Sequence, residues 1–368
     1  MAEPLKAIGL MSGTSLDGVD AALLATDGED YAVPGPTLGL RYDPDMRAML
    51  RTALDDAQSV AAGAPVPFSI REAERRVTEV HAEAVKALLA KAGLTPRDVA
   101  LIGFHGQTIL HRPEKRLTWQ LGDGALLSRL TGIAVVNDFR SADVKAGGQG
   151  APLVPLYHAA LVRNAAPGDL PVVLVNIGGV ANVTYVGKKE VLAFDTGPGN
   201  APIDDWMQRH SGRPIDENGD FARTGKIDDA ALERMLTSAF FALRPPKSLD
   251  RLDFGTSDVE GLSPEDGAAT LTAFTAASIA KAREHFAEIP NRWIVCGGGR
   301  HNRTLMDGLR ARVNAPVLAA EDAGWNGDFI EAEAFAYLAV RSSKGLPLSL
   351  PTTTGVRRPM TGGKFHRA

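Results

Sequence analysis

A turn rich in glycine and hydroxyl groups joins two short apolar segments close to the start of the chain. The two segments, residues 7–10 and 19–24, consist of branched and small apolar side chains, a composition typical of strands. The order strand, glycine turn, strand predicts a hairpin. It differs from the strand, turn, helix order of the Walker and dinucleotide-binding loops.

The composition of this turn indicates a phosphate-binding loop. Consecutive backbone N–H groups in a tight glycine turn form a concavity for anionic oxygens, and glycine permits close approach to the backbone. Its two carboxylates would repel a bare phosphate, so we expect Mg²⁺ to accompany the nucleotide. A plain hairpin turn with Asx caps is the alternative. The candidate nucleotide-binding residues are Gly13, Thr14, Ser15, Leu16, Asp17, Gly18, Val19 and Asp20.

The second half of the chain repeats the arrangement. Residues 172–177 and 182–186 are expected strands on either side of another glycine turn. A third expected strand, residues 293–296, ends in three glycines, where a flat adenosine could lie against the backbone. The candidate nucleotide-binding residues in this half are Gly178, Gly179, Gly297, Gly298 and Gly299.

Two hairpin turns followed by a glycine triplet resemble the pattern of the superfamily that joins actin, hexokinase and the heat-shock chaperone ATPases. Rival phosphate motifs are missing, since the sequence has no GxxxxGK[ST] and no GxGxxG after its first strand. The resemblance implies an α/β protein with the two-domain actin-like (ribonuclease H-like) ATPase fold and a nucleotide cleft between the lobes. Cys296 is expected to be a small buried residue and not a nucleophile.

The length and the order of elements predict two domains. A chain of 368 residues is long for one hydrophobic core, and apolar strand-like runs alternate with helical patterns. We place the N-terminal lobe at residues 1–136, with the tail 346–368 returning to it, and the C-terminal lobe at residues 137–345. The expected helices are residues 69–93, 268–286 and 330–340, and a further buried strand is expected at residues 99–104.

Charge and composition argue against several classes of protein. The net charge of −4 shows no basic excess, so we expect no nucleic-acid partner. The single cysteine allows no intrachain disulfide and no four-thiolate metal site. The chain has neither a run of 18 or more apolar residues nor a secretory signal at its start. We therefore expect a cytoplasmic protein that does not associate with membranes.

Six sequence blocks carry a more specific resemblance, to the anhydro-N-acetylmuramic acid kinase family. Any one short block would be weak support, but all six occur in the order of that family and span nearly the whole chain. The blocks are GLMSGTSLDGVD at residues 9–20, HGQT at 105–108, NDFR at 137–140 with GGQGAPLVP at 147–155, NIGGVAN at 176–182, FDTGPGN at 194–200 and EAEAFA at 331–336.

This resemblance implies a kinase of peptidoglycan recycling that uses ATP and Mg²⁺. Such an enzyme converts the amino sugar 1,6-anhydro-N-acetylmuramic acid and water into N-acetylmuramic acid 6-phosphate. Water opens the anhydro bridge at C1, and the freed O6 takes the γ-phosphoryl group. The resemblance also implies that the two domains close on their ligands and that two copies of the chain could form a homodimer. The residues that would bind Mg²⁺ are unknown.

Asp195 is the predicted catalytic base. It follows an expected strand at residues 191–194 and precedes a Gly-Pro-Gly turn, which would hold the carboxylate rigidly. A base is needed because neutral water attacks an anomeric carbon poorly and O6 must reach phosphorus as a nucleophile. An Asx turn that caps the following residues also fits the spacing, and the family resemblance favours the catalytic role.

Polar residues outside the glycine turns are candidates for binding the sugar. Arg140 could bind the lactyl carboxylate by a bidentate contact, and a surface ion pair is the alternative. A buried structural histidine is the alternative for His105. For Glu331, the alternative is an acid at a helix start that the helix dipole favours. The candidate substrate-binding residues are His105, Gln107, Asp138, Arg140 and Glu331.

Two other functions fit the same fold. One is a kinase for a plain sugar or a small carboxylate, which the HGQT and DTGPGN blocks argue against. The other is a chaperone-like or actin-like switch, in which ATP drives the binding of a protein partner. No spare segment could supply a peptide-binding module, and ATP turnover measured with and without the anhydro sugar would separate a kinase from a switch.

Overall fold

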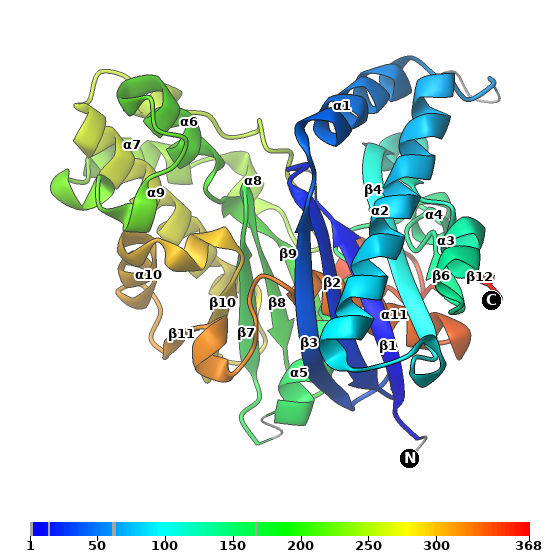
Figure 1. The fold of residues 1–368 in the computed structure, drawn as a ribbon. Coiled ribbons are helices and arrows are strands. Elements are labelled where there is room, and N and C mark those ends of the chain that lie inside the picture. The colour runs from blue at the N-terminus through cyan, green and yellow to red at the C-terminus, as the bar shows by residue number, and fades with distance from the viewer. Residues whose placement is uncertain (1–2, 14, 61–63, 166–167) are drawn as a thin grey trace. The chain divides into compact units, whose positions relative to one another are not determined.

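Two compact α/β units make up the chain in the computed structural model (Figure 1). Unit 1 comprises Met1–Ala165 and Phe329–Ala368, and unit 2 comprises Ala166–Asp328. None of the helices in the described part of the chain is long and apolar enough to cross a membrane. The structure describes residues 3–13, 15–60, 64–165 and 168–368.

A mixed sheet forms the centre of unit 1. Its strands follow the order β12-β6-β4-β1-β2-β3, and β5 pairs with the far half of β4. Strands β1, β2 and β3 are antiparallel neighbours, whereas β4 and β6 run parallel to β1. The strands are β1 (Leu5–Ser12), β2 (Gly18–Thr26), β3 (Ala32–Arg41), β4 (Leu101–Arg112), β5 (Leu117–Leu121), β6 (Val135–Asn137) and β12 (Lys364–His366).

Helices cover both faces of this sheet. On one face, Ile8 and Leu10 of β1 join a buried core with side chains of the first three helices, α1, α2 and α3. The alternate residue, Gly9, faces α11 on the opposite side, as the two-residue period of a strand requires. The helices of unit 1 are α1 (Pro44–Ser59), α2 (Phe68–Ala92), α3 (Gly124–Thr131), α4 (Ser141–Lys145), α5 (Pro155–Ala165), α11 (Ile330–Ser343) and α12 (Pro351–Thr354).

The sheet of unit 2 repeats the strand order of the first. Its order is β11-β10-β7-β8-β9, with three antiparallel strands followed by two parallel ones. Cys296 at the end of β10 is buried, as predicted. The elements are β7 (Val172–Ile177), β8 (Val180–Val186), β9 (Val191–Pro198), β10 (Arg292–Cys296), β11 (Val317–Ala319), α6 (Ala201–Ser211), α7 (Asp229–Leu236), α8 (Ala239–Ala242), α9 (Pro264–Lys281) and α10 (Arg303–Arg310).

The boundary between the units differs from the predicted one. The chain leaves unit 1 at Ala165 and returns at Phe329, whereas the sequence placed these points after residues 136 and 345. Strand β6 pairs with β4 inside the first sheet, and α11, which was assigned to the C-terminal lobe, packs on β1. The tail 346–368 does belong to unit 1. The sequence pattern did not indicate which helices pack on the first sheet, and that packing sets the boundary of the unit.

Backbone contact between α11 and the first sheet depends on two glycines. A Cβ at Gly9 would lie 1.7 Å from the carbonyl oxygen of Ala332, and one at Gly103 would lie 2.0 Å from that of Phe335. Real Cβ atoms do not approach a backbone oxygen so closely, so these positions of β1 and β4 accept only glycine. The EAEAFA block that begins α11 is therefore a packing surface as well as a family signature.

Replacing Gly103 by Ala should destabilise unit 1, because α11 would have to move away from β4. We expect a loss of about 2–3 kcal/mol, which lowers the melting temperature by roughly 5–10 °C. The matched control is Gly255→Ala, where the added Cβ meets no atom within 4 Å. Thermal unfolding followed by circular dichroism compares the two, and equal melting temperatures would contradict the packing account.

Candidate functional site

The β1–β2 turn of unit 1 leaves open space beside Gly13. A Cβ at this position would meet only the hydroxyl oxygen of Ser15, at 3.6 Å. The φ of Gly13 lies outside the left-handed region, so glycine is not required by backbone conformation here. The backbone of the turn is thus accessible to a ligand, which is what a phosphate loop requires.

Gln107 holds this turn in place from the neighbouring strand. The Ser12 hydroxyl donates to its Oε1 at 2.6 Å, and its Nε2 donates to the carbonyl oxygen of Gly13 at 3.1 Å. The side chain is fully buried. Gln107 was predicted to bind the sugar, but both ends of its amide are occupied by the glycine turn. The structure therefore assigns it a role in shaping the loop.

The other residues of the turn divide between packing and polar roles. Gly18 is needed for packing, since a Cβ there would lie 2.3 Å from the carbonyl oxygen of Leu40. Leu16 and Val19 are buried in the core, so only their backbone could meet a ligand. Thr14 lies outside the described residues. The Ser15 hydroxyl donates to Asp17 Oδ1 at 2.7 Å.

Two carboxylates lie close to the β1–β2 turn. Burial raises the pKa of Tyr42, and the negative charges of Asp17 and Asp20 raise it further. The Tyr42 hydroxyl lies 2.9 Å from the Ser12 hydroxyl, next to the turn. Within the described ranges, no group of three or more His, Cys, Asp or Glu side chains could hold a metal ion. Asp17 and Asp20 are the candidate carboxylate ligands for Mg²⁺ at this turn.

In unit 2, the glycine-containing segments that follow β7, β9 and β10 meet at the same end of the strands. Cβ atoms at Gly178, Gly179 and Gly298 would have only ordinary contacts, with nearest atoms at 3.7, 3.6 and 3.9 Å. Gly297 and Gly299 are packing positions, where a Cβ would lie 2.3 Å from Asn176 Oδ1 and Ile177 Cγ2 respectively. Three of the five predicted glycines thus leave accessible backbone.

Asn200 connects these segments, and the sequence prediction did not single it out. Its backbone N–H donates to the carbonyl oxygen of Gly178 at 2.7 Å, and its Nδ2 donates to that of Ile177 at 3.3 Å. A Cβ on Gly298 would have Asn200 Nδ2 as its nearest atom. The signal was present in the DTGPGN block, whose last residue is this asparagine.

Arg140 and His105 form a polar pair on the α11 side of unit 1. Arg140 Nε donates to His105 Nε2 at 2.9 Å, and Arg140 Nη1 donates to the carbonyl oxygen of Gly150 at 2.7 Å. Burial and the Arg140 charge hold the pKa of His105 well below its ordinary value. The histidine is therefore neutral and accepts at Nε2. Among the described residues, none accepts from Arg140 Nη2, which leaves this nitrogen for a ligand.

Glu331 lies near this pair, whereas Asp138 has a different partner. Burial lowers the pKa of Arg140, and the negative charge of Glu331 opposes that effect. Glu331 is exposed in the first turn of α11. Asp138, a candidate for binding the sugar, forms an ion pair of 2.8 Å with Lys364. It lines a polar cavity of about 270 Å³ that Lys364 and His105 also border.

Asp195 lies in β9 of unit 2, at the edge of the sheet. Its backbone N–H donates to the carbonyl oxygen of Lys247 at 2.9 Å, and its Oδ2 accepts from the Leu249 N–H at 2.8 Å. Within the described chain, Oδ1 accepts no hydrogen bond. Burial raises the pKa of this carboxyl to about 6, and the Leu249 hydrogen bond partly offsets the effect. Asp195 makes no Asx-turn bond to the residues that follow it, so the alternative role is not observed.

The repeated strand order and the accessible glycine turns define the class of protein. Three antiparallel strands followed by two parallel ones occur in each unit, which is the predicted ribonuclease H-like order of the actin-like ATPase fold. Residues 5–367 match the family model described as "Anhydro-N-acetylmuramic acid kinase". The chain therefore belongs to the anhydro-N-acetylmuramic acid kinase family.

Individual relatives agree with the family match. Anhydro-N-acetylmuramic acid kinase of Methylobacterium nodulans is 53% identical over 99% of this chain and 100% of its own length. That of Rhodospirillum rubrum is 53% identical over 98% of this chain and 94% of its own length. Among solved structures, component A of (R)-2-hydroxyglutaryl-CoA dehydratase from Acidaminococcus fermentans has a TM-score of 0.48 at 12% identity, and the match covers 92% of this chain and 99% of that one.

Replacing Gly13 by Val should weaken nucleotide binding, because the side chain would occupy the open space beside the turn. We expect the affinity for a non-hydrolysable ATP analogue to fall about tenfold or more, a loss of roughly 1.4 kcal/mol. Gly255→Val, at a position that also has open space, is the control. Calorimetric titration measures both, and an unchanged affinity of Gly13→Val would remove this turn from the nucleotide site.

Proposed function

We propose that this protein uses ATP and water to convert 1,6-anhydro-N-acetylmuramic acid into N-acetylmuramic acid 6-phosphate, as a step of peptidoglycan recycling. The kinase activity follows from membership of the family. The hydrolytic opening of the anhydro ring, the use of Mg²⁺ and the roles of single residues are proposals, each supported by the geometry of the residues concerned.

The geometry of Asp195 is the observation that carries this proposal. A general base works best when its pKa lies near the operating pH, and burial raises the pKa of Asp195 to about 6. The carboxylate is fixed at one oxygen by the Leu249 N–H, which leaves the other oxygen for a reactant. A rigid, partly desolvated carboxylate with one free oxygen has the properties of a catalytic base.

The proposed reaction transfers one proton to Asp195. Asp195 Oδ1 takes a proton from water while the water oxygen forms a bond to C1 of the sugar. The bond between C1 and the bridging O6 breaks, and O6 attacks the γ-phosphorus of ATP. The bond from phosphorus to the leaving oxygen of ADP then breaks. The products are the 6-phosphorylated sugar, ADP and the proton, which Asp195 releases to solvent.

Accessible backbone at the glycine turns would bind the phosphates of ATP. No neighbouring atom fills the space beside Gly13, Gly179 or Gly298, so phosphate oxygens could approach the backbone of each turn and adenosine could approach the backbone at Gly298. The Gly178 N–H already donates to the carbonyl oxygen of Val180 at 3.2 Å. When bound, Mg²⁺ would neutralise charge on the β- and γ-phosphates. Asp17 and Asp20 are the carboxylates that fit such an ion from the side of the protein.

Arg140 would bind the lactyl carboxylate that distinguishes muramic acid from plain amino sugars. Its Nε and Nη1 are held by His105 and Gly150, so the guanidinium plane is fixed and Nη2 remains available. This feature favours a carboxylate-bearing sugar over the alternative kinase for a plain sugar. Glu331, whose charge acts on Arg140, would accept from a sugar hydroxyl. A cytoplasmic location, expected from the sequence, and a homodimer, expected from the family, are part of the same proposal.

Replacing Asp195 by Asn keeps the size of the side chain but removes the proton acceptor. Ring opening and phosphoryl transfer should fail together, with kcat lower by roughly 10²–10⁴-fold. Binding of ATP and of the sugar should persist, because the base acts chiefly in the transition state. Steady-state kinetics, together with calorimetric titration of both ligands, measures the two effects.

Asp220→Asn is the matched control, since Asp220 is an exposed aspartate of the same unit. It should retain the kcat and melting temperature of the unmodified protein. If Asp195 served mainly to bind sugar, KM would rise more than kcat falls. A folded Asp195→Asn protein with nearly unchanged kcat would contradict the assignment of the base.

A further inference from the structure

We propose that Lys247 is a positioning residue for Asp195, acting through the backbone of residues 247–249. This inference rests on the proposed role of Asp195 as the base. Lys247 would not touch the substrate or the reacting atoms. Its side chain would fix the segment that holds the base at the free edge of the sheet.

The edge position of β9 explains why Asp195 needs this support. An edge strand has one side of unpaired N–H and C=O groups, and β9 ends the order β11-β10-β7-β8-β9. Residues 247–249 cover that side at Asp195, where the Lys247 carbonyl accepts the Asp195 N–H and the Leu249 N–H binds Oδ2. The same short segment therefore fixes both the backbone and the carboxylate.

The register of β9 is also irregular next to Asp195. The pairing of β8 with β9 shifts between Ala181 and Asn182, and Asn182 is the residue opposite Asp195. Such an irregularity disrupts the ladder locally. On the β8 side, the strand pairing is thus weakest where the carboxylate must be held, so the contacts on the other side of β9 decide its position.

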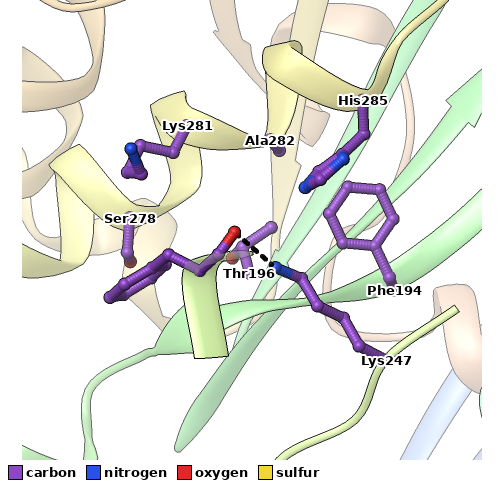
Figure 2. A pocket seen from close by; sticks show the side chains of 8 residues that line it. Phe194, Thr196, Lys247, Ser278, Lys281, Ala282 and His285 are labelled. Carbon is purple, nitrogen blue, oxygen red and sulfur yellow. Dashed lines mark hydrogen bonds between the residues drawn. The ribbon is translucent and has the colours of Figure 1, made fainter. Parts of the chain in front are cut away.

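Lys247 anchors the segment to the end of α8. Its Nζ donates to the carbonyl oxygen of Phe240 at 3.0 Å and, at 3.5 Å, to that of Phe241. It also lies 4.4 Å from the centre of the Phe240 ring and 5.8 Å from that of Phe194, within the range of a cation–π contact. Figure 2 shows the side chain in this pocket beside Phe194 and His285.

Helix α8 is itself fixed by aromatic packing on α9. The rings of Phe240, Phe241 and Phe254 are mutually in contact at 5.7–6.1 Å. Phe241 and Phe254 each contact Phe274 of α9, at 6.0 and 5.4 Å. Aromatic packing on α9 therefore holds α8 in place, α8 binds the Lys247 side chain, and the backbone of Lys247 binds Asp195.

The pKa shifts of Asp195 and Lys247 have different causes. Burial raises the pKa of Asp195, and the hydrogen bond from the Leu249 N–H lowers it. Burial lowers the pKa of Lys247, Glu284 opposes this effect, and the positive charge of Lys281 adds to it. His285 is the remaining titratable group of the pocket. The contacts of Lys247 support a geometric role, because its Nζ binds the carbonyl oxygen of Phe240 while its own carbonyl oxygen binds the Asp195 N–H.

The test compares Lys247→Met, which keeps the apolar stem but loses the donors, with Lys247→Arg, which keeps a cationic donor. A displacement of the base by about 1 Å can cost roughly 10²-fold in rate. We expect Lys247→Met to lower kcat by roughly 10–10²-fold with the KM for sugar and ATP nearly unchanged. Lys247→Arg should recover most of the loss. Lys281→Met, in the same pocket, is the control and should retain kcat.

A double-mutant cycle decides whether Lys247 works through Asp195. If it does, adding Lys247→Met to Asp195→Asn should lower the residual rate no further. An additional loss in the double variant would overturn the inference, as would a Lys247→Met protein with full kcat. A large rise in the KM for ATP or sugar would also overturn it, by indicating direct contact with a ligand. Asp195→Asn alone reports on the proposed function, so the two failures are distinguishable.

Discussion

Close contact of one backbone with another is the constraint on which the fold and the site both depend. In unit 1, α11 touches β1 and β4 where Gly9 and Gly103 leave no room for a Cβ. In unit 2, a Cβ on Gly199 would lie 2.2 Å from the carbonyl oxygen of Gly178, so the two loops also meet by their backbones. These glycines fix the helix and the loops by direct backbone contact, because no side chain stands between them.

Glycines in the motifs therefore have two different physical roles, which the sequence does not separate. Gly13, Gly178 and Gly298 have open space where a side chain would be, whereas Gly18 and Gly299 are filled by neighbouring atoms. Only the first group fits direct contact with a nucleotide. A substitution in the second group would act first on packing, and its effect on binding would follow from that.

Local pattern predicted much of the fold but not its division into units. The two hairpins, the long helix α2 and the strand that precedes the glycine triplet were confirmed. Strand β3 and helix α1 were not predicted. Strand β3 carries two prolines and two glycines, and its apolar and polar residues do not alternate regularly. The boundary was wrong because the packing of α5 and α11 on the first sheet is a long-range property.

The candidate site was predicted as a set of residues but not as a set of contacts. The geometry of Asp195 fits its predicted role. The contact between Arg140 and His105 was not predicted, although both residues were candidates for binding the sugar. Three contacts could not be predicted from the sequence. They are the hydrogen bonds of Gln107 with the glycine turn, the ion pair of Asp138 with Lys364 and the hydrogen bonds of Asp195 with residues 247–249. Each depends on side chains or backbone from segments far apart in the sequence.

The central claim is that Asp195 directs water to C1 of the sugar while O6 receives the phosphoryl group. The most direct measurement is a single turnover in ¹⁸O-labelled water, with the product analysed by mass spectrometry before its anomeric oxygen exchanges with solvent. The account predicts one ¹⁸O atom at C1, a phosphate on O6 and no label in that phosphate. Label in released inorganic phosphate, or an unlabelled C1 oxygen, would contradict it.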